Sequence, residues 1–197
     1  MTVFIHVEVS ARELDSTLLL AVLAAEKGHS VVLGDVIGGV ERRLFKPGIF
    51  HTKTLSPSPK IVSRHERIRS SGHQITSVDE EAGLTGLSYD YFARVRFSDR
   101  TISQSSAVFT WGSTDYNALR SAYPAHSEKF HLTGSPRADL WRPRFSPYWG
   151  RLQSFPAKPF LLVTSNLGIP RLSAAEELSS LVSIAAFQRN PQHRLDL

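Results

Sequence analysis

A short unit occurs twice in the first 80 residues and limits the folds available to this chain. The segments 28–35 (GHSVVLGD) and 72–79 (GHQITSVD) each begin at a glycine, enter a short apolar run and end at an aspartate. Glycine commonly ends a helix, and a short run rich in β-branched residues after it predicts a strand. The repetition therefore indicates strands that alternate with helices, which favours a mostly parallel sheet with right-handed crossovers.

The same signals, followed along the chain, predict an α/β fold with a Rossmann-like, mostly parallel sheet and helices on both faces. Strands are expected at 3–9, 30–34, 48–52, 74–78, 107–111 and 129–133. Helices are expected from Ser10, where Glu13 completes a capping-box pattern, from Pro59, and over 113–122. The first helix is apolar almost all round and is therefore expected to be buried. Residues 82–104 give no clear pattern.

The expected domain organisation has three parts. Residues 1–140 form the Rossmann-like domain, and residues 141–159, which contain four prolines, form a linker. The run 160–164 (FLLVT) predicts a new strand, and Ser173 with Glu176 predicts the start of a helix. Residues 160–197 are therefore interpreted as the incomplete start of a second domain, because one βα unit cannot form a closed core.

Composition excludes several classes of function. The chain has no cysteine, so disulfides, cysteine metal sites and thiol nucleophiles are excluded. The N-terminus lacks a basic segment, and the longest apolar run, 18–25, is much shorter than a membrane span. A cytoplasmic location, at most peripheral to an inner membrane, is expected. The net charge of +5 comes from scattered arginines, which argues against a specific nucleic-acid surface.

Candidate site residues follow the predicted strands, because ligands of open α/β sheets bind at the carboxyl ends of the strands. These candidates are Glu8, Arg12, Lys53, Ser56, Glu80, Trp111, Gly112, Gly134, Arg137 and Asp139. Glu8 interrupts an apolar strand before a helix and is the candidate general base, the group that an acceptor hydroxyl requires. Lys53 and Ser56 are expected either to bind an anion or to lie on the surface. Trp111 is equally compatible with a position in the core. Glu13 is interpreted as a helix cap.

Motifs of other chemistries are weak or missing in the sequence. The eight histidines show no metal-ligand spacing, so no metal site is expected. No GxGxxG motif follows the first strand, and 34–39 (GDVIGG) is only a weak glycine-rich phosphate loop. A GxSxG nucleophile elbow is also absent from the sequence. The sequence therefore disfavours a dinucleotide site, a P-loop and an α/β-hydrolase.

Several segments together resemble bacterial surface carbohydrate biosynthesis proteins. They are Glu8, 11–20 (ARELDSTLLL), 27–34 (KGHSVVLG), 53–57 (KTLSP), 79–81 (DEE), 109–112 (FTWG) and 133–139 (TGSPRAD). They cover the first 140 residues in order, and 160–166 (FLLVTSN) resembles the first strand of the family's second domain. The last piece of the first domain, Gly-x-Pro-Arg-x-Asp, alone is also similar to teichoic-acid glycerophosphotransferases and sugar-nucleotide 2-epimerases.

The resemblance implies one half of a GT-B arrangement, in which two Rossmann-like domains face a cleft. It implies a role in lipopolysaccharide or capsule biosynthesis, with a glycan or lipid-linked acceptor on the first domain and a sugar-nucleotide donor, without other cofactors, on the second. Arg12 and Arg137 would then lie around a phosphate or an acidic sugar. Because most of the second domain is missing here, the chain is expected to be truncated and inactive alone.

Alternative functions remain open at this stage. The chain is a glycosyltransferase-like acceptor-binding half, or a non-catalytic module that binds a glycan or a partner chain completing the second domain. A relative of the epimerases or the glycerophosphotransferases is the third alternative.

Overall fold

The computed structural model describes residues 1–82 and 88–152 of the chain. Met1–Gly150 forms one compact unit, which extends past the expected domain boundary at residue 140. The strand and the helix expected at 160–164 and from Ser173 lie outside the described residues.

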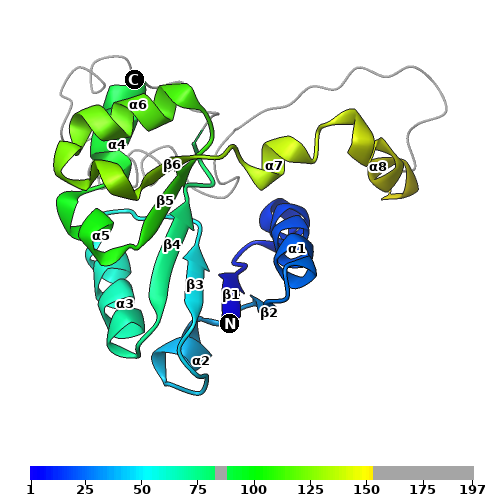
Figure 1. Cartoon of the computed structure of the whole chain (residues 1–197), viewed down its shortest axis with the longest axis horizontal. Coiled ribbons are helices and arrows are strands. Elements are labelled where there is room, and N and C mark those ends of the chain that lie inside the picture. Colours follow the sequence, from blue (N-terminus) through cyan, green and yellow to red (C-terminus); the bar gives the residue numbers. More distant parts are fainter. Residues whose placement is uncertain (83–87, 153–197) are drawn as a thin grey trace, which may run out of the picture. The chain divides into compact units, whose positions relative to one another are not determined.

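A sheet of six parallel strands forms the centre of this unit, in the order β2-β1-β3-β4-β5-β6 (Figure 1). The strands are β1 (Thr2–His6), β2 (Ser30–Gly34), β3 (Ile49–Thr52), β4 (Gln74–Val78), β5 (Ala107–Thr110) and β6 (Phe130–Leu132). Each lies within or beside a segment that the sequence predicts as a strand. The expected α/β fold with a parallel, Rossmann-like sheet is confirmed.

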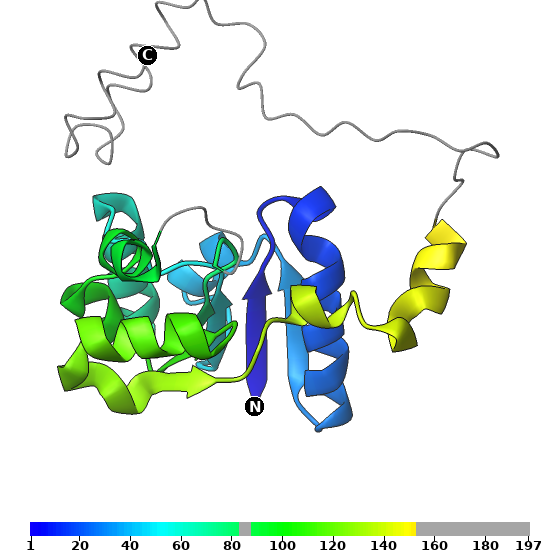
Figure 2. The same ribbon diagram turned by 90° about the horizontal axis from the view of Figure 1, so that it is seen from above.

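The helices that connect the strands are distributed unevenly over the two faces of the sheet. They are α1 (Ser10–Glu26), α2 (Ile37–Glu41), α3 (Pro59–Ser70), α4 (Tyr89–Arg96), α5 (Asp99–Gln104), α6 (Ser113–Ala122), α7 (Pro136–Asp139) and α8 (Ser146–Leu152), with 3₁₀ turns at Pro124–Lys129 and Pro143–Phe145. Figure 1 and, from above, Figure 2 show α3 to α6 on one side of the strands and α1 on the other. None of the helices in residues 1–82 and 88–152 is long and apolar enough to cross a membrane.

One continuous core lies between the sheet and α2 to α6. Alternate strand residues point into this core, and side chains of these helices and of nearby loops pack against them. The strand members are Phe4, Phe50, Ile75, Val108 and Phe130, and the helix and loop members include Val40, Leu55, Ile68, Phe92, Ile102 and Leu119. The opposite strand residues, among them Val3, Ile49 and Phe109, face the side that α1 covers only in part. The core therefore holds the sheet rigid on one face.

The expectation that α1 is well buried holds for only one side of this helix in the part of the chain that the structure describes. Glu13, Ser16, Thr17 and Ala21 form its buried side, and the small side chains among them allow the helix to lie close to the sheet. A set of larger apolar residues lies between 40% and 49% exposed: Leu14, Leu18, Val22 and Leu23. The helix thus leaves several of its bulky apolar residues partly exposed.

The weak phosphate-loop signal at 34–39 also has a different structural basis. Gly34 ends β2 with φ at +138°, and Gly38 and Gly39 lie inside the short helix α2. Gly38 and Gly39 thus lie in the first turn of a five-residue helix, where backbone amides have no acceptor within the helix. The weak phosphate-loop signal stays a prediction.

Gly48 occupies a position at which the strands approach too closely for a side chain. Its amide donates to Nδ1 of His73 at 3.2 Å, and its carbonyl oxygen accepts from the amide of Gln74 at 2.9 Å. A Cβ atom at this position would lie 2.3 Å from the carbonyl oxygen of Thr2. We therefore expect Gly48→Ala to lower the free energy of unfolding by about 1–3 kcal/mol, because the backbone of β1 or β3 must shift.

Urea unfolding followed by circular dichroism measures this effect. Gly38→Ala is the matched control, because a Cβ atom there meets no atom within 4 Å and alanine suits a helix better than glycine. A stability of Gly48→Ala equal to that of Gly38→Ala would contradict the predicted clash.

Candidate active site at the carboxyl edge of the sheet

The order of the strands places the topological switch point of the sheet at the carboxyl ends of β1 and β3. The chain leaves β1 through α1 to reach β2, and then crosses to β3 on the other side of β1. Because α1 and α3 lie on opposite faces of the sheet, the loops after β1 and β3 leave the sheet in opposite directions. Open α/β sheets bind ligands at such a switch point. Glu8 and Arg12 follow β1, and Lys53 follows β3.

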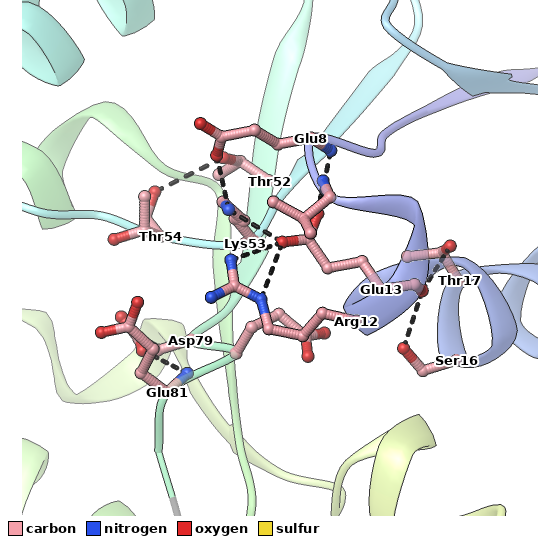
Figure 3. Close-up of polar contacts among 12 residues, drawn as sticks. Glu8, Arg12, Glu13, Ser16, Thr17, Thr52, Lys53, Thr54, Asp79 and Glu81 are labelled. Carbon is pink, nitrogen blue, oxygen red and sulfur yellow. Dashed lines mark hydrogen bonds and ion pairs between the residues drawn. The ribbon is translucent and has the colours of Figure 1, made fainter. Parts of the chain in front are cut away.

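The buried carboxylate of Glu13 holds these residues together. It accepts hydrogen bonds from Lys53 Nζ at 2.8 Å, from Arg12 Nη2 at 2.8 Å and from the amides of Glu8 and Val9. Lys53 Nζ also contacts Glu8 Oε2 at 2.5 Å, and Figure 3 shows Lys53 and Arg12 pointing toward Glu13. Only 1% of the Glu13 side chain is exposed, against 61% for Glu8. Glu13 therefore holds the loop after β1 from its buried side, while the side chain of Glu8 faces solvent.

Glu13 thus does more than the helix cap that the sequence predicts. The helix begins at Ser10. Its N-cap residue is Val9, whose side chain makes no hydrogen bond to the first amides of the helix. Glu13 instead accepts from the two amides that precede the helix, and it also binds two cations, Arg12 of α1 and Lys53 after β3. It is the principal positioning residue of this end of the site.

Hydrogen bonds and charges shift the pKa values of this group in a consistent direction. Burial raises the pKa of Glu13, but hydrogen bonds from Lys53, from Arg12 and from the backbone overcome it and lower the pKa to about 2. A hydrogen bond and the charge of Lys53 lower the pKa of Glu8. Burial lowers the pKa of Lys53, and the hydrogen bonds to both glutamates more than compensate and raise it. All three side chains are therefore charged at neutral pH.

A second group lies at the end of β4. Arg96 of α4 donates from Nε and from Nη2 to the two carboxylate oxygens of buried Asp79, at 3.1 Å each. Its Nη1 atom contacts Glu81 Oε2 at 2.9 Å, and Nη2 also donates to Thr54 Oγ1 after β3. Burial raises the pKa of Asp79 against the opposing charge of Arg96. Arg96 thereby joins α4 to the loops after β3 and β4.

Glu80 and Arg137 form the third group, between the ends of β4 and β6. Arg137 Nη2 lies 2.6 Å from Glu80 Oε2, and Arg137 Nη1 donates to the carbonyl oxygen of Glu80 at 3.2 Å. Burial raises the pKa of Glu80, Arg137 opposes this shift, and the neighbouring charges of Glu13 and Asp79 add to it. The amide of Glu80 donates to the carbonyl oxygen of Lys53 at 3.1 Å. This bond connects the third group to the first.

Trp111 completes the layer at the end of β5. Its indole Nε1 atom donates to the carbonyl oxygen of Asp79 at 2.8 Å, and its ring packs against the edge of the core. Buried Asp115 accepts from the amides of Trp111 and Gly112 at 2.9 and 2.8 Å, and so holds the turn before α6. Trp111 is both a core residue, as one interpretation expects, and a member of the polar edge.

The candidate residues thus fall into two sets. The structure brings together Glu8, Arg12, Lys53, Glu80, Trp111 and Arg137 in one connected layer, to which it adds Glu13, Asp79, Glu81 and Arg96. Ser56 and Gly112 make local turn bonds instead. Asp139 pairs with Arg142 and, together with Gly134, lines a separate groove on the open face of the sheet.

The charge of this layer decides which ligands suit it. Its ion pairs join five carboxylates (Glu8, Glu13, Asp79, Glu80, Glu81) to four cations (Arg12, Lys53, Arg96, Arg137). Arg12 and Arg137, which the resemblance places around a phosphate, instead pair with Glu13 and Glu80. Because each of these cations already pairs with a carboxylate, the layer disfavours an anionic ligand. Within residues 1–82 and 88–152, no cluster of three or more His, Asp or Glu side chains is placed to hold a metal ion.

Fold and edge together define an α/β protein with an all-parallel, Rossmann-like sheet and an ionic layer at its carboxyl edge. No protein-family model matches the chain, and no curated protein matches it. Among solved structures, the transcription regulator CcpA of Lactococcus lactis is similar, with 10% sequence identity and a TM-score of 0.32 over 72% of this chain and 81% of that chain. A TM-score this low does not establish a shared fold.

Proposed function

We propose that this chain is the acceptor-binding half of a glycosyltransferase-like protein of surface carbohydrate biosynthesis, and that its carboxyl edge binds a neutral glycan. The observation that carries this proposal is the ionic layer at the switch point, in which exposed charged side chains lie next to buried charged side chains. Glu8, Glu81 and Arg12 are exposed, whereas Glu13, Asp79 and Glu80 beneath them are buried. A sugar hydroxyl both donates and accepts, so a surface of alternating carboxylates and guanidinium groups suits it.

The buried partners hold the exposed side chains in place, which makes this surface suitable for a ligand without net charge. Lys53 is held by Glu8 and Glu13, and Arg96 is held by Asp79 and Glu81. Side chains that are already ordered lose less entropy when a ligand binds. Trp111 adds an apolar surface next to these charges, and its indole is fixed by the bond to Asp79. Pre-organisation thus supports recognition of a ligand that contributes no net charge.

Glu8 is the residue that we assign to the acceptor hydroxyl. In a transfer reaction this hydroxyl would attack the donor sugar, the bond to the leaving nucleotide would break, and Glu8 would take the hydroxyl proton. Lys53 lowers the pKa of Glu8, which keeps its carboxylate ionised and makes it a weaker base. This direction favours hydrogen bonding to the acceptor over rapid proton removal.

Glycan binding without catalysis is therefore the second candidate function, because the same lowered pKa of Glu8 favours it. Calorimetry of the full chain with sugar nucleotides separates the two candidates. Donor binding with a micromolar dissociation constant supports the transferase. Binding of a neutral oligosaccharide without any donor binding supports the non-catalytic module.

The binding proposal predicts that Glu8→Gln weakens binding of a neutral oligosaccharide at least about tenfold, because a charged hydrogen-bond acceptor is lost. Calorimetric titration with a panel of neutral di- and trisaccharides and with the corresponding sugar phosphates measures this effect. Glu66→Gln is the matched control, since Glu66 pairs with Arg100 on the outer surface of α3. Tighter binding of the phosphates, or equal affinities of Glu8→Gln and Glu66→Gln, would refute the proposal.

A further inference from the structure

The turn after α2 exposes an apolar side chain between positive charges. The segment 42–46 (RRLFK) contains Arg42, Arg43 and Lys46 around Leu44 and Phe45. Leu44 is 71% exposed, the largest exposed fraction of any large apolar side chain in the part of the chain that the structure describes. A single exposed leucine needs no explanation, whereas leucine among lysine and arginine is typical of segments that lie on membranes.

The conformation of this turn directs Leu44 outward. Helix α2 ends in a Schellman motif, in which the amide of Leu44 donates to the carbonyl oxygen of Gly39 at 3.0 Å. The amide of Arg43 donates to the carbonyl oxygen of Val40 at 3.2 Å. Arg43 has a φ of +59°, at the position where glycine is the usual residue. The residue after it commonly packs back on the helix in this motif, but Leu44 is exposed instead.

Two contacts attach the turn to the rest of the fold. The ring of Phe45 packs on the ring of Phe4 in the core, with the centroids 5.0 Å apart. It also lies against Gly39 of α2, where a Cβ atom would be 2.5 Å from the ring. The guanidinium group of Arg43 donates to the carbonyl oxygen of Ser70, at the end of α3, at 2.9 Å. The turn is thereby held by the core on one side and by α3 on the other.

The end of α3 adds further cations to this part of the molecule. Arg67 pairs with Glu41 of α2 at 3.1 Å, Arg69 is exposed, and Figure 1 shows α2 next to the end of α3. Glu66 of α3 pairs with Arg100 of α5 instead. The fold thus gathers cations that are scattered in the sequence, with Glu41 as the carboxylate among them. We call this set the basic surface: Arg42, Arg43, Lys46, Arg67 and Arg69.

The sequence outside the described residues does not offset the charge of the basic surface. Residues 83–87 (GLTGL) contain no charged side chain, and residues 153–197 contain four basic and three acidic side chains. These residues therefore have no excess of acidic side chains that could neutralise the basic surface. A partner with negative charge fits this surface best.

The apolar part of this surface favours a lipid bilayer over a nucleic acid. Surfaces that bind nucleic acids combine cations with aromatic rings that stack on bases. The ring of Phe45 packs on Phe4, and the most exposed apolar side chain is Leu44, which is aliphatic and suits the acyl chains of a lipid. We propose that the basic surface binds the surface of an anionic membrane, with Leu44 inserted between the lipid head groups.

The basic surface lies away from the candidate active site. The turn precedes β3 and the end of α3 precedes β4, so both lie at the amino edge of the sheet. The ionic layer lies at the carboxyl edge, at the other end of the strands. A membrane on the basic surface therefore leaves the carboxyl edge uncovered, and membrane binding neither requires nor excludes the proposed glycan site.

Flotation of the full chain with lipid vesicles tests this proposal. Vesicles of phosphatidylcholine with about 30% phosphatidylglycerol should bind the chain at least about tenfold more tightly than vesicles of phosphatidylcholine alone. Raising the NaCl concentration from about 0.1 M to about 0.5 M should weaken this binding, because salt screens exposed charges. Equal binding to both kinds of vesicle, or binding to neither, overturns the proposal. A chain that binds a DNA duplex but neither kind of vesicle assigns the basic surface to a nucleic acid instead.

Substitution of the exposed leucine tests the apolar part of the contact. Leu44→Ser should weaken binding to the anionic vesicles at least about fivefold, because an inserted apolar side chain is lost. Leu132→Ser is the matched control, since Leu132 is 54% exposed at the end of β6, at the carboxyl edge, and this variant should bind as the wild type does. Equal affinities of the two variants would overturn the proposal.

Substitution of two cations tests the position of the charged contact. The double variant Arg42→Gln, Lys46→Gln should bind the anionic vesicles at least about tenfold more weakly, because each cation near an anionic surface contributes about fivefold. The double variant Arg94→Gln, Arg120→Gln removes the same charge from α4 and α6, which lie away from α2 in Figure 1, and should stay within about twofold of the wild type. Circular dichroism verifies that each variant is folded. An equal loss in both double variants would show that net charge alone, and not the basic surface, attracts the chain to the vesicles.

Discussion

Replacing Glu13 by glutamine is expected to lower the free energy of unfolding at pH 7 by about 3 kcal/mol. The carboxylate is buried, and its pKa of about 2 lies well below the ordinary value of 4.5. A shift of this size corresponds to about 3 kcal/mol of preferential stabilisation of the charged form in the folded state. Glutamine keeps the shape of the side chain but leaves Arg12 without its carboxylate and Lys53 with Glu8 alone. Urea unfolding at pH 7 measures the loss.

The pH dependence of this loss identifies its cause. Because the folded-state pKa of Glu13 is lowered, its stabilisation is fully present above pH 4.5 and disappears as the pH falls toward 2. The difference between wild type and Glu13→Gln should therefore shrink between pH 5 and pH 2. Glu66→Gln, which removes an exposed ion pair, should change stability by less than about 1 kcal/mol at either pH. A loss in Glu13→Gln that is equal at pH 7 and pH 2.5 would indicate a packing effect instead.

Two buried histidines are expected to make the protein sensitive to mild acid, and His65 offers the cleaner test. Burial lowers the pKa values of His51 and His65 to about 4. Neither ring nitrogen of His65 has a hydrogen-bond partner in the part of the chain that the structure describes. A lowered folded-state pKa means that unfolding takes up a proton between pH 6.5 and 4, so stability falls over this range. Each histidine contributes a loss of about 3 kcal/mol by pH 4.

His65→Leu should therefore remove about 3 kcal/mol of the stability lost between pH 7 and pH 4, and should be neutral or stabilising at pH 7 because it replaces an unpartnered buried polar group. Thermal or urea unfolding over this pH range measures both effects. His29→Leu, at a partly exposed position before β2, is the control and should retain the acid sensitivity of the wild type. A His65→Leu variant with the same pH profile as the control would show that His65 is not the group that titrates.

The fold was predictable because the signals of its central elements are local. The strands at 30–34 and 74–78 agree with β2 and β4 to the residue, and the helix expected from the Ser113 cap to about Ala122 corresponds to α6, whose N-cap is Gly112. The short helix α5 escapes prediction because its capping pair, Ser98 with Thr101, is not the usual Ser/Thr with Glu. The exposed side of α1 also escapes it, because an apolar helix pattern does not tell which side meets the sheet.

The candidate site was predictable only in part, because some of its residues come together through tertiary packing that no local sequence signal predicts. Glu8, Lys53, Glu80 and Arg137 lie at strand ends, where the parallel topology alone brings residues together. Arg96 lies in α4, in a segment without a clear pattern, and only the packing of α4 places its guanidinium group on Asp79. Glu13 has the sequence signature of a cap, and its contacts with Arg12 and Lys53 depend on where β3 lies.

The proposal of a neutral glycan site at the carboxyl edge is tested most directly by NMR spectroscopy of the Trp111 indole. The chain has three tryptophans, and Trp111→Phe assigns the indole N–H signal that the bond to Asp79 holds in place. Titration with the best-binding neutral oligosaccharide should shift this signal and the amide signals of Glu8 and Glu80, and leave that of Arg69 on α3 unchanged. If the signals at the edge stay in place, or if only residues that line the groove on the other face of the sheet respond, such as Val3, Ile49 and Phe109, the ligand does not bind where the ionic layer lies and the proposed site is wrong.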